Sequence, residues 1–257
     1  MTSDPVLLVE QLTKRYADFT AVADVSFTLG RGRTLALVGE SGAGKSTIGA
    51  VVTGLTSATS GRVELVAEAG AADRRTRRGS RLQLVPQDPY STLDPRQSIG
   101  SALDEAVTLA GRMSRADRSA RTTQLLDLVG LSSEHARLLP RSLSGGQRQR
   151  VAIARALAAD PDVLVLDEAV SALDVSVQAQ VLNVLNRVQR ESGTAYLFIT
   201  HDFAVVRQIA DEVLVLRGGR AVEYGSADQV LGAPEAAYTR SLLDATPRPG
   251  WRLPSAG

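Results

Sequence analysis

The sequence predicts an α/β fold with a largely parallel, doubly wound sheet, an antiparallel β subdomain and an α-helical subdomain. Three observations support this fold class. Apolar and polar residues alternate over the first thirty positions, helical spacing dominates residues 99–139, and short apolar runs alternate with helical segments from 147 to 217. The last pattern is typical of a parallel sheet covered by helices, because each parallel connection needs a crossover.

Composition excludes several classes of function before any motif is considered. The 257 residues are 44% hydrophobic, enough for a sizeable core, and 29 basic residues nearly balance 28 acidic ones. Such a balance argues against a protein that coats nucleic acid, and no nucleic acid partner is expected. The chain has no cysteine and two histidines, which excludes disulfides, a cysteine-ligated zinc site and a thiol nucleophile, and argues against a multi-histidine metal site.

No segment of the sequence predicts insertion into a membrane. No apolar run approaches the length of about eighteen residues that a membrane helix needs. The first ten residues contain Asp4 and Pro5 and lack the basic region and apolar run of a signal peptide. The chain is therefore expected in the cytoplasm, and any work at a membrane is expected to go through a partner.

The first third of the chain is expected to hold strands and one helix. Period-two runs at 6–16 and 21–29 predict antiparallel strands, separated at Ala17 and Asp18. Residues 34–38 form an apolar run that is followed by Gly39, which predicts a buried strand that leads into a glycine-containing loop. A helix is expected over 47–55 and another strand over 62–66.

The middle of the chain is expected to be a solvated loop followed by a helical insert. The loop, 67–81, contains Arg74, Arg75, Arg77 and Arg78, for which contact with phosphates or lipid headgroups is the alternative. Apolar residues at helical spacing then predict two helical stretches within 99–139, with a polar stretch, 112–121, between them.

The last third alternates between helices and strands up to a tail. Helices are expected over 147–159, 175–191 and 203–210, and strands over 163–166, 196–200 and 212–217. We expect one domain over 4–243, with a core and β subdomain in 4–87 and 160–243 and a helical part in 88–159. The proline-containing tail, 244–257, is expected to be flexible, although its lone Trp251 could dock.

One segment carries a phosphate-binding motif. Gly39-Glu40-Ser41-Gly42-Ala43-Gly44-Lys45-Ser46 fits G-x-x-x-x-G-K-[ST] at every fixed position, and Thr47 follows it into the helix. The glycines let backbone N–H groups turn toward a phosphate, and the positive end of the helix points there. Lys45 can reach the β- and γ-phosphates, and the Ser46 hydroxyl can ligate Mg²⁺. The motif predicts a P-loop NTPase with a RecA-like parallel sheet core.

Guanine specificity of the usual kind is excluded. It needs an Asn-Lys-x-Asp motif, but the only lysines are Lys14 and Lys45, and neither follows an asparagine.

Two carboxylates end the apolar run 163–166. Asp167 is placed to hold Mg²⁺, as a Walker-B aspartate does, and Glu168 is placed to polarise the attacking water as general base. An apolar strand with acidic residues at its end is common by itself, but together with the phosphate loop it predicts a hydrolytic site.

A second potential anion site precedes the helix expected at 147–159. Leu143-Ser144-Gly145-Gly146-Gln147 combines an N-cap serine with two glycines that permit close backbone approach. One ATP does not need two helix ends from distant parts of one domain. The pentapeptide resembles the signature motif of ABC ATPases, and the resemblance implies a nucleotide held between two head-to-tail domains, with the signature of one facing the γ-phosphate bound by the other.

Further motifs resemble those of ABC ATPases in the family's order, over residues 6–243. Tyr16 resembles the aromatic residue that stacks on adenine, with a buried strand tyrosine as the alternative. Gln87 resembles the Q-loop glutamine of the Mg²⁺ and water network. Asp174, in Ser171-Ala172-Leu173-Asp174, resembles the D-loop that crosses to the other subunit. His201 resembles the switch histidine that contacts the γ-phosphate.

Two positions stand outside this pattern. Ala169 follows Glu168 where the family often has proline, which affects only the backbone turn. His135 has no motif around it and is expected to be a surface helix residue.

Two strings resemble the dipeptide, oligopeptide and nickel importer subfamily, Gln87–Arg96 and Tyr238–Leu243. The resemblance implies the ATP-hydrolysing subunit of an importer of peptides, nickel or a related small solute, peripheral on the cytoplasmic face of the cell membrane. The implied cofactors are ATP and Mg²⁺. The implied partners are two integral-membrane permease subunits, a second ATPase subunit that is a paralogue or a copy, and, indirectly, an extracellular solute-binding protein.

Three alternatives remain open. The chain could be a soluble ABC ATPase acting on DNA or ribosomes, although no heptad run or cysteine module lies between Lys45 and Ser144. It could be a non-catalytic module whose nucleotide regulates assembly, against which Glu168 and His201 argue. It could also serve an exporter, against which the two subfamily strings argue.

Overall fold

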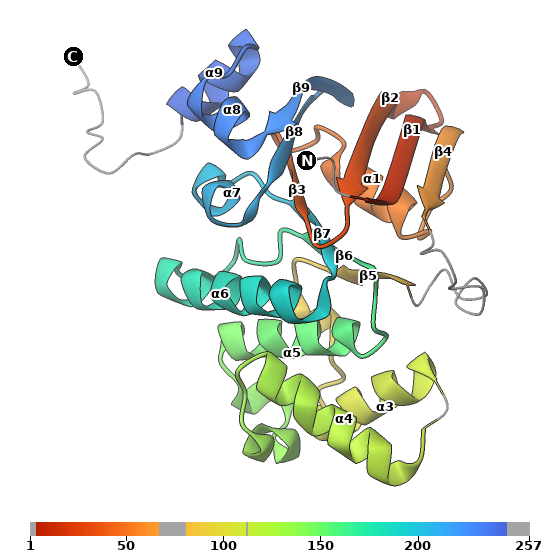
Figure 1. Cartoon of the computed structure of the whole chain (residues 1–257), viewed down its shortest axis with the longest axis vertical. Helices are drawn as coiled ribbons and strands as arrows, with labels where there is room; N and C mark the ends of the chain where they lie inside the picture. The colour runs from red at the N-terminus through yellow and green to blue at the C-terminus, as the bar shows by residue number, and fades with distance from the viewer. Residues whose placement is uncertain (1–3, 67–80, 112, 246–257) are drawn as a thin grey trace.

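Two sheets and a group of helices build the protein (Figure 1). The computed structural model describes residues 4–66, 81–111 and 113–245. The arginine cluster at 74–78 and Trp251 lie outside the described residues. The predicted fold class is confirmed, because a parallel sheet, an antiparallel sheet and a helical part are all present.

The antiparallel sheet has three strands in the order β2-β1-β4. They are β1 (Pro5–Tyr16), β2 (Phe19–Gly30) and β4 (Ser60–Leu65). A two-residue turn joins β1 to β2, and Ala17 takes a φ of 47° there, as hairpin turns of this length require. The turn sets Tyr16 opposite Phe19 at the tip of the hairpin.

The second sheet has six strands in the order β5-β6-β7-β3-β8-β9. They are β3 (Thr34–Val38), β5 (Leu82–Val85), β6 (Val163–Asp167), β7 (Ala195–Ile199), β8 (Glu212–Arg217) and β9 (Arg220–Ser226). The neighbouring pairs are parallel except for β8 and β9, which form an antiparallel edge. Because β3, β7 and β6 are parallel neighbours, the segments that follow them lie at one edge of the sheet, where ligands of such folds bind.

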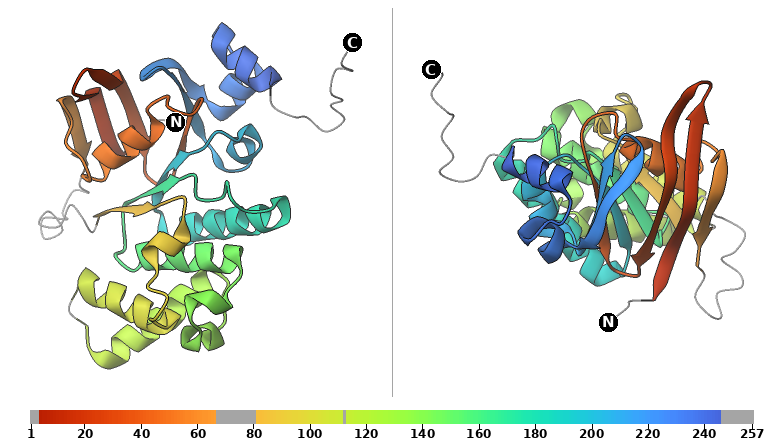
Figure 2. Two further views of the ribbon diagram at one scale, coloured as in Figure 1. Left: turned by 180° about the vertical axis from the view of Figure 1, so that it is seen from behind. Right: turned by 90° about the horizontal axis from the view of Figure 1, so that it is seen from above.

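Helices cover both faces of this sheet (Figure 2). They are α1 (Lys45–Val52), α3 (Ile99–Ala110), α4 (Arg115–Leu128), α5 (Gly145–Leu157), α6 (Val175–Ser192), α7 (Phe203–Ile209), α8 (Ala227–Gly232) and α9 (Ala237–Asp244), with the 3₁₀ segments η2 (Pro89–Thr92), η3 (Ser133–Arg137) and η4 (Pro140–Ser142). Within the three described ranges, none of the helices combines the length and apolarity needed to cross a membrane.

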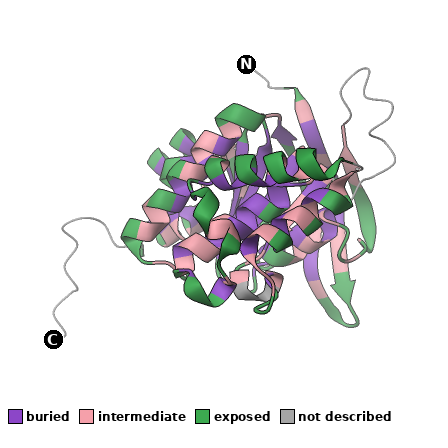
Figure 3. Cartoon of the chain, turned by 90° about the horizontal axis from the view of Figure 1, so that it is seen from below, coloured by how far each residue is buried: buried purple, intermediate pink, exposed green. Residues whose placement is uncertain are grey.

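The alternation of side chains along β6 places α1 and α5 on opposite faces of the sheet. Val163 and Val165 belong to the core that contains α1 and the antiparallel sheet. Leu164 and Leu166 belong to the core shared with α3, α4, α5 and α6. Buried residues fill the centre of the molecule in Figure 3. The phosphate loop and the signature segment are therefore separated by the sheet within one chain.

Several boundaries differ from the sequence expectations by a few residues, and those of α4 and α9 change the extent of the predicted loop and tail. The helix α4 already begins at Arg115, inside the stretch expected to separate two helices, because the Ser114 side chain caps it and its outer face is polar. The helix α9 runs to Asp244, so the tail begins one residue later than expected. Its Thr239 is fully buried, and Arg240 Nη1 donates to the carbonyls of Pro234 and Glu235, both at 2.9 Å.

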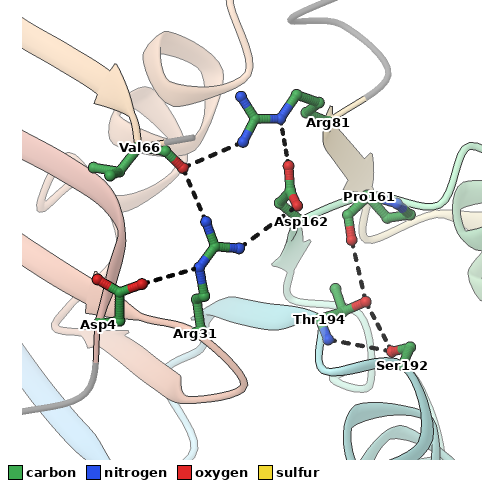
Figure 4. Close-up of polar contacts among 8 residues, drawn as sticks. All are labelled: Asp4, Arg31, Val66, Arg81, Pro161, Asp162, Ser192 and Thr194. Atoms are coloured by element: carbon green, nitrogen blue, oxygen red, sulfur yellow. Dashed lines mark hydrogen bonds and ion pairs between the residues drawn. The ribbon is translucent and has the colours of Figure 1, made fainter. Parts of the chain in front are cut away.

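A polar cluster ties the two sheets together at the edge opposite the phosphate loop (Figure 4). Arg31, after β2, lies 3.6 Å from Asp4 and 3.8 Å from Asp162 and donates to the Val66 carbonyl at 3.1 Å. Arg81, before β5, donates to the same carbonyl at 3.2 Å and pairs with Asp162. Asp162 is thus a shared carboxylate for two arginines from different sheets.

Replacing Asp162 with alanine is expected to lower the free energy of unfolding by about 2–3 kcal/mol, since two mostly buried guanidinium groups lose this carboxylate. The matched control is Glu64→Ala, which removes the exposed Arg62–Glu64 pair and is expected to cost less than about 1 kcal/mol. Urea unfolding of both variants measures the difference. Equal losses in the two variants would show that the cluster contributes nothing beyond a surface ion pair.

Candidate nucleotide site

The phosphate loop connects β3 to α1 and surrounds a buried lysine. The Lys45 side chain is only 6% exposed, and its Nζ donates to the carbonyls of Gly39 and Glu40, each at 2.8 Å. Burial lowers the pKa of Lys45, while the carboxylates of Glu168 and Asp167 oppose that shift. The ammonium group is thus held inside the loop by backbone oxygens, at the place where a phosphate would meet it.

Glycine is required at both ends of the loop. Gly39 has a φ of 148°, and a Cβ there would lie 2.2 Å from the Leu216 carbonyl oxygen. Gly44 has a φ of 99°, and a Cβ there would lie 2.5 Å from the Ala21 carbonyl oxygen. Each contact is shorter than real Cβ contacts, so the loop backbone lies directly against both sheets at these two positions and has no space for a side chain.

A glycine turn that the sequence reasoning missed supports the loop from behind. Gly219, in the turn between β8 and β9, donates its N–H to the Ala43 carbonyl at 3.1 Å, and its own carbonyl accepts from the Ala23 N–H at 2.8 Å. The Gly218-Gly219 pair after a predicted strand is a hairpin signal that could have located this turn.

Two oxygen groups meet at the start of α1. Ser46 Oγ donates to Asp167 Oδ1 at 3.0 Å. Burial raises the pKa of Asp167; the Ser46 hydrogen bond and the Lys45 charge oppose the shift, and the Glu168 charge adds to it. A hydroxyl and a carboxylate side by side are ligands that Mg²⁺ prefers, so the donor set fits this ion.

Glu168 and His201 form a pair at the ends of β6 and β7. The Glu168 Oε1 atom lies 3.2 Å from His201 Nδ1, which is the donor of this contact when the carboxylate is ionised. The backbone N–H of Glu168 donates to the Ile199 carbonyl at 2.9 Å, and its φ is 47°, in the left-handed region. The side chain of His201 is 59% exposed and that of Glu168 is 24% exposed, so the pair opens to solvent.

Gln87 approaches this pair through a serine rather than through the Ser46–Asp167 contact. Its Nε2 donates to Ser171 Oγ at 3.4 Å, and Ser171 Oγ donates to the Glu168 carbonyl at 2.9 Å. The structure thus links Gln87 to the backbone of the predicted base.

Asp174 begins α6 and is exposed. Its Oδ1 accepts from the Val177 N–H at 2.9 Å and from Ser176 Oγ at 2.7 Å. The Val177 hydrogen bond is the main cause of the lowered pKa of Asp174. Its first observable role is therefore to cap the helix.

The signature segment begins α5 as a capping box. Ser144 Oγ accepts from the Gln147 N–H at 3.3 Å, and Gln147 Oε1 accepts from the Ser144 N–H at 2.9 Å. A Cβ at Gly146 would lie 2.2 Å from Val177 Cγ1, so the N-terminal ends of α5 and α6 pack without space for a side chain. In Figure 1 the helix α5 lies between α6 and the pair α3 and α4, away from α1.

Tyr16 is not the buried strand tyrosine that the sequence left as an alternative. It is 47% exposed at the tip of the first hairpin, next to the exposed Phe19, and Lys14 Nζ lies 4.7 Å from its ring centroid. Its ring is accessible for stacking on a planar ligand.

The structure brings five of the predicted side chains to one edge of the parallel sheet, namely Lys45, Ser46, Asp167, Glu168 and His201. They supply a cation for phosphate, oxygen ligands for a divalent ion, and a carboxylate oriented by an imidazole. This arrangement suits hydrolysis of a phosphoanhydride.

Comparisons with known proteins agree with this chemistry. A family model described as ABC transporter matches residues 22–171. The dipeptide transport ATP-binding protein of Haemophilus influenzae is 46% identical over 231 residues, which cover 89% of this chain and 71% of that protein. A di/tripeptide transport ATP-binding protein of Pseudomonas aeruginosa is 46% identical over 239 residues, covering 92% of this chain and 74% of that one.

Solved structures are similar as well. CbiO1 of Clostridium perfringens, part of an ABC transporter complex, superposes with a TM-score of 0.80 at 28% identity, over 91% of this chain and 93% of that chain. A dimeric ATP-binding cassette in a post-hydrolysis state with ADP and phosphate superposes with a TM-score of 0.73 at 26% identity, over 86% of this chain and 98% of that chain.

Proposed function

This chain belongs to the ABC transporter family, and from that premise we propose that it is the ATP-hydrolysing subunit of an importer that takes up peptides. The observation that carries the proposal is the set of five side chains at one sheet edge, in a chain whose relatives are named for dipeptide and tripeptide transport. No motif position of the hydrolytic site is replaced by an inert residue, which favours turnover over nucleotide-regulated assembly.

Each residue has a role in this proposal. Tyr16 stacks on adenine, and residues 39–47 bind the phosphates through backbone N–H groups and Lys45. Ser46 and Asp167 would hold Mg²⁺, with Gln87 joining its water network, and the ion would neutralise charge on the phosphates. Glu168 accepts the proton of the attacking water, and His201 orients Glu168 and the γ-phosphate.

The signature segment acts on a different ATP from the one held by its own phosphate loop. Because α5 and α1 lie on opposite faces of the sheet, Ser144–Gln147 is free to meet a nucleotide bound by a second subunit, and the exposed Asp174 faces that subunit beside it. The second subunit is a paralogue or a second copy. Two integral-membrane permeases complete the transporter, and the chain sits at the cytoplasmic face of the membrane.

The domain has two parts, each formed by different segments of the chain. Residues 4–87 and 160–243 form the nucleotide-binding core, and 88–159 form the helical part that presents the signature. The transported solute is a peptide, and the alternative within the subfamily is nickel or a related small solute. An extracellular binding protein delivers the solute to the permeases.

The first experiment is a pull-down of tagged protein from gently solubilised membranes, with the bound proteins identified by mass spectrometry. Recovery of two multi-span permeases, with or without a second ATPase, supports the transporter and resolves the pairing. Recovery of only ribosomal or DNA-bound proteins would keep the ATPase and overturn the transport role.

The purified complex is then placed in lipid vesicles with a labelled dipeptide and its binding protein. ATP on the cytoplasmic side is expected to drive the peptide across toward that side, and Lys45→Met is the inactive control. Movement in the opposite direction would identify an exporter, and movement of Ni²⁺ but not of dipeptide would reassign the solute.

A further inference from the structure

The histidine expected to be a surface helix residue also contacts the signature segment. His135 lies on η3, is half-buried, and its Nε2 is 3.3 Å from Gln147 Nε2. The η3 segment is fixed in place, because Ile99 of α3 donates to the Leu138 carbonyl at 2.9 Å. The space between η3 and α3 is also closed, since a Cβ at Gly100 would lie 3.0 Å from Ala136.

The neighbours of His135 decide which of its nitrogens carries the hydrogen. Nδ1 lies 3.2 Å from the Ser132 carbonyl, which can only accept, and 2.9 Å from Ser132 Oγ. A hydrogen on Nδ1 can be donated to the Ser132 carbonyl, and Nε2 of that tautomer then has a lone pair for Gln147. The other tautomer would set an Nε2–H against the amide NH₂ of Gln147, donor against donor.

The same reasoning fixes the amide of Gln147. Its Oε1 accepts from the Ser144 N–H at 2.9 Å, so its NH₂ must point to His135 Nε2. The amide is thus specified at both ends, by a donor in the signature segment and by an acceptor on η3. Rotation of the amide by 180° would break both contacts.

We propose that His135 is a positioning residue of the ATPase, whose Nε2 holds the Gln147 amide and so keeps the Ser144–Gln147 segment in the form that meets the second subunit's nucleotide. This inference rests on the proposed function, in which that segment works across the subunit interface. His135 touches no phosphate itself, and it acts through Gln147 alone.

Two substitutions of His135 distinguish the effect of its hydrogen-bond acceptor from the effect of its size. His135→Leu keeps a similar size and has no acceptor, whereas His135→Gln can place an amide oxygen near the position of Nε2. Both variants lose Nδ1 and its contacts with Ser132, so a role that depended on those contacts alone predicts equal effects. The acceptor role predicts a defect in the leucine variant and rescue in the glutamine variant.

The test uses the permease complex isolated above together with the free chain. We expect His135→Leu to lower the ATPase kcat of the complex about tenfold, the size of effect that one lost hydrogen bond at a site can give, and His135→Gln to stay within about threefold of the wild type. Binding of a fluorescent ATP analogue to the free chain is expected to be unchanged in both, because its own phosphate loop is intact.

The outcomes distinguish the two proposals. A wild-type rate for His135→Leu, or equal losses in the leucine and glutamine variants, would overturn the positioning role alone. Loss of analogue binding by the free chain would also overturn it, because the defect would then be general. A wild-type complex that hydrolyses no ATP would overturn the proposed function and this inference with it.

Discussion

Replacing Glu168 with glutamine is expected to lower ATP hydrolysis by about 10²–10⁴-fold while leaving ATP binding intact, because the amide keeps the shape of the side chain but cannot accept a proton. The Glu168 Oε1 atom lies 3.2 Å from His201 Nδ1, and Glu168 directly follows Asp167, which contacts Ser46. With hydrolysis blocked, two subunits joined by ATP are expected to stay joined.

Single-turnover hydrolysis measures the first effect, and size-exclusion chromatography with light scattering measures the second. The control is Glu191→Gln, at an exposed glutamate in the last turn of α6, which is expected to change neither quantity. A wild-type turnover rate in Glu168→Gln would contradict the assignment of the base.

Replacing Gly44 with alanine is expected to weaken ATP binding by at least tenfold and to lower the free energy of unfolding by about 2–4 kcal/mol. The left-handed backbone costs an L-residue about 1–2 kcal/mol, and the added Cβ would lie 2.5 Å from the Ala21 carbonyl oxygen, a backbone atom of β2. The loop must shift away from β2, and its N–H groups then no longer converge on one phosphate.

The matched control lies two residues earlier in the same loop. Gly42 has a φ of 79°, but a Cβ there meets nothing within 4 Å, so Gly42→Ala carries the backbone strain of about 1–2 kcal/mol without the collision. Calorimetric titration with ATP and urea unfolding compare the two variants. Equal effects would show that backbone strain, and not the approach to β2, makes Gly44 necessary.

The sequence could predict what is local along the chain. The phosphate loop, the carboxylates at the end of β6 and the histidine after β7 each follow a short apolar run, and a parallel sheet brings such strand ends to one edge. Seven strands and four helices were expected within three residues of their observed bounds, because many of their apolar runs are bounded by glycine, proline or capping residues.

The rest depends on contacts between distant segments. The strand β9 and the turn at Gly219 were missed, since β9 is half-exposed and shows no clear alternation, and its pairing is decided by β8. The start of α4 was misplaced because an exposed helix face is as polar as a loop. The contact between His135 and Gln147 joins residues on separate helices, and no periodicity in either segment predicts it.

If Glu168 is the proposed base, its backbone sets hydrolysis against folding stability at the end of β6. A φ of 47° is unfavourable for a glutamate, and glycine would adopt it freely, so the residue that the chemistry needs is not the one that the turn prefers. The surrounding sheet, which fixes the Glu168 N–H on Ile199, supplies the stability that tolerates this mismatch. A substitution that relaxed this turn, such as Glu168→Gly, would therefore remove the proposed base while leaving the phosphate loop unchanged.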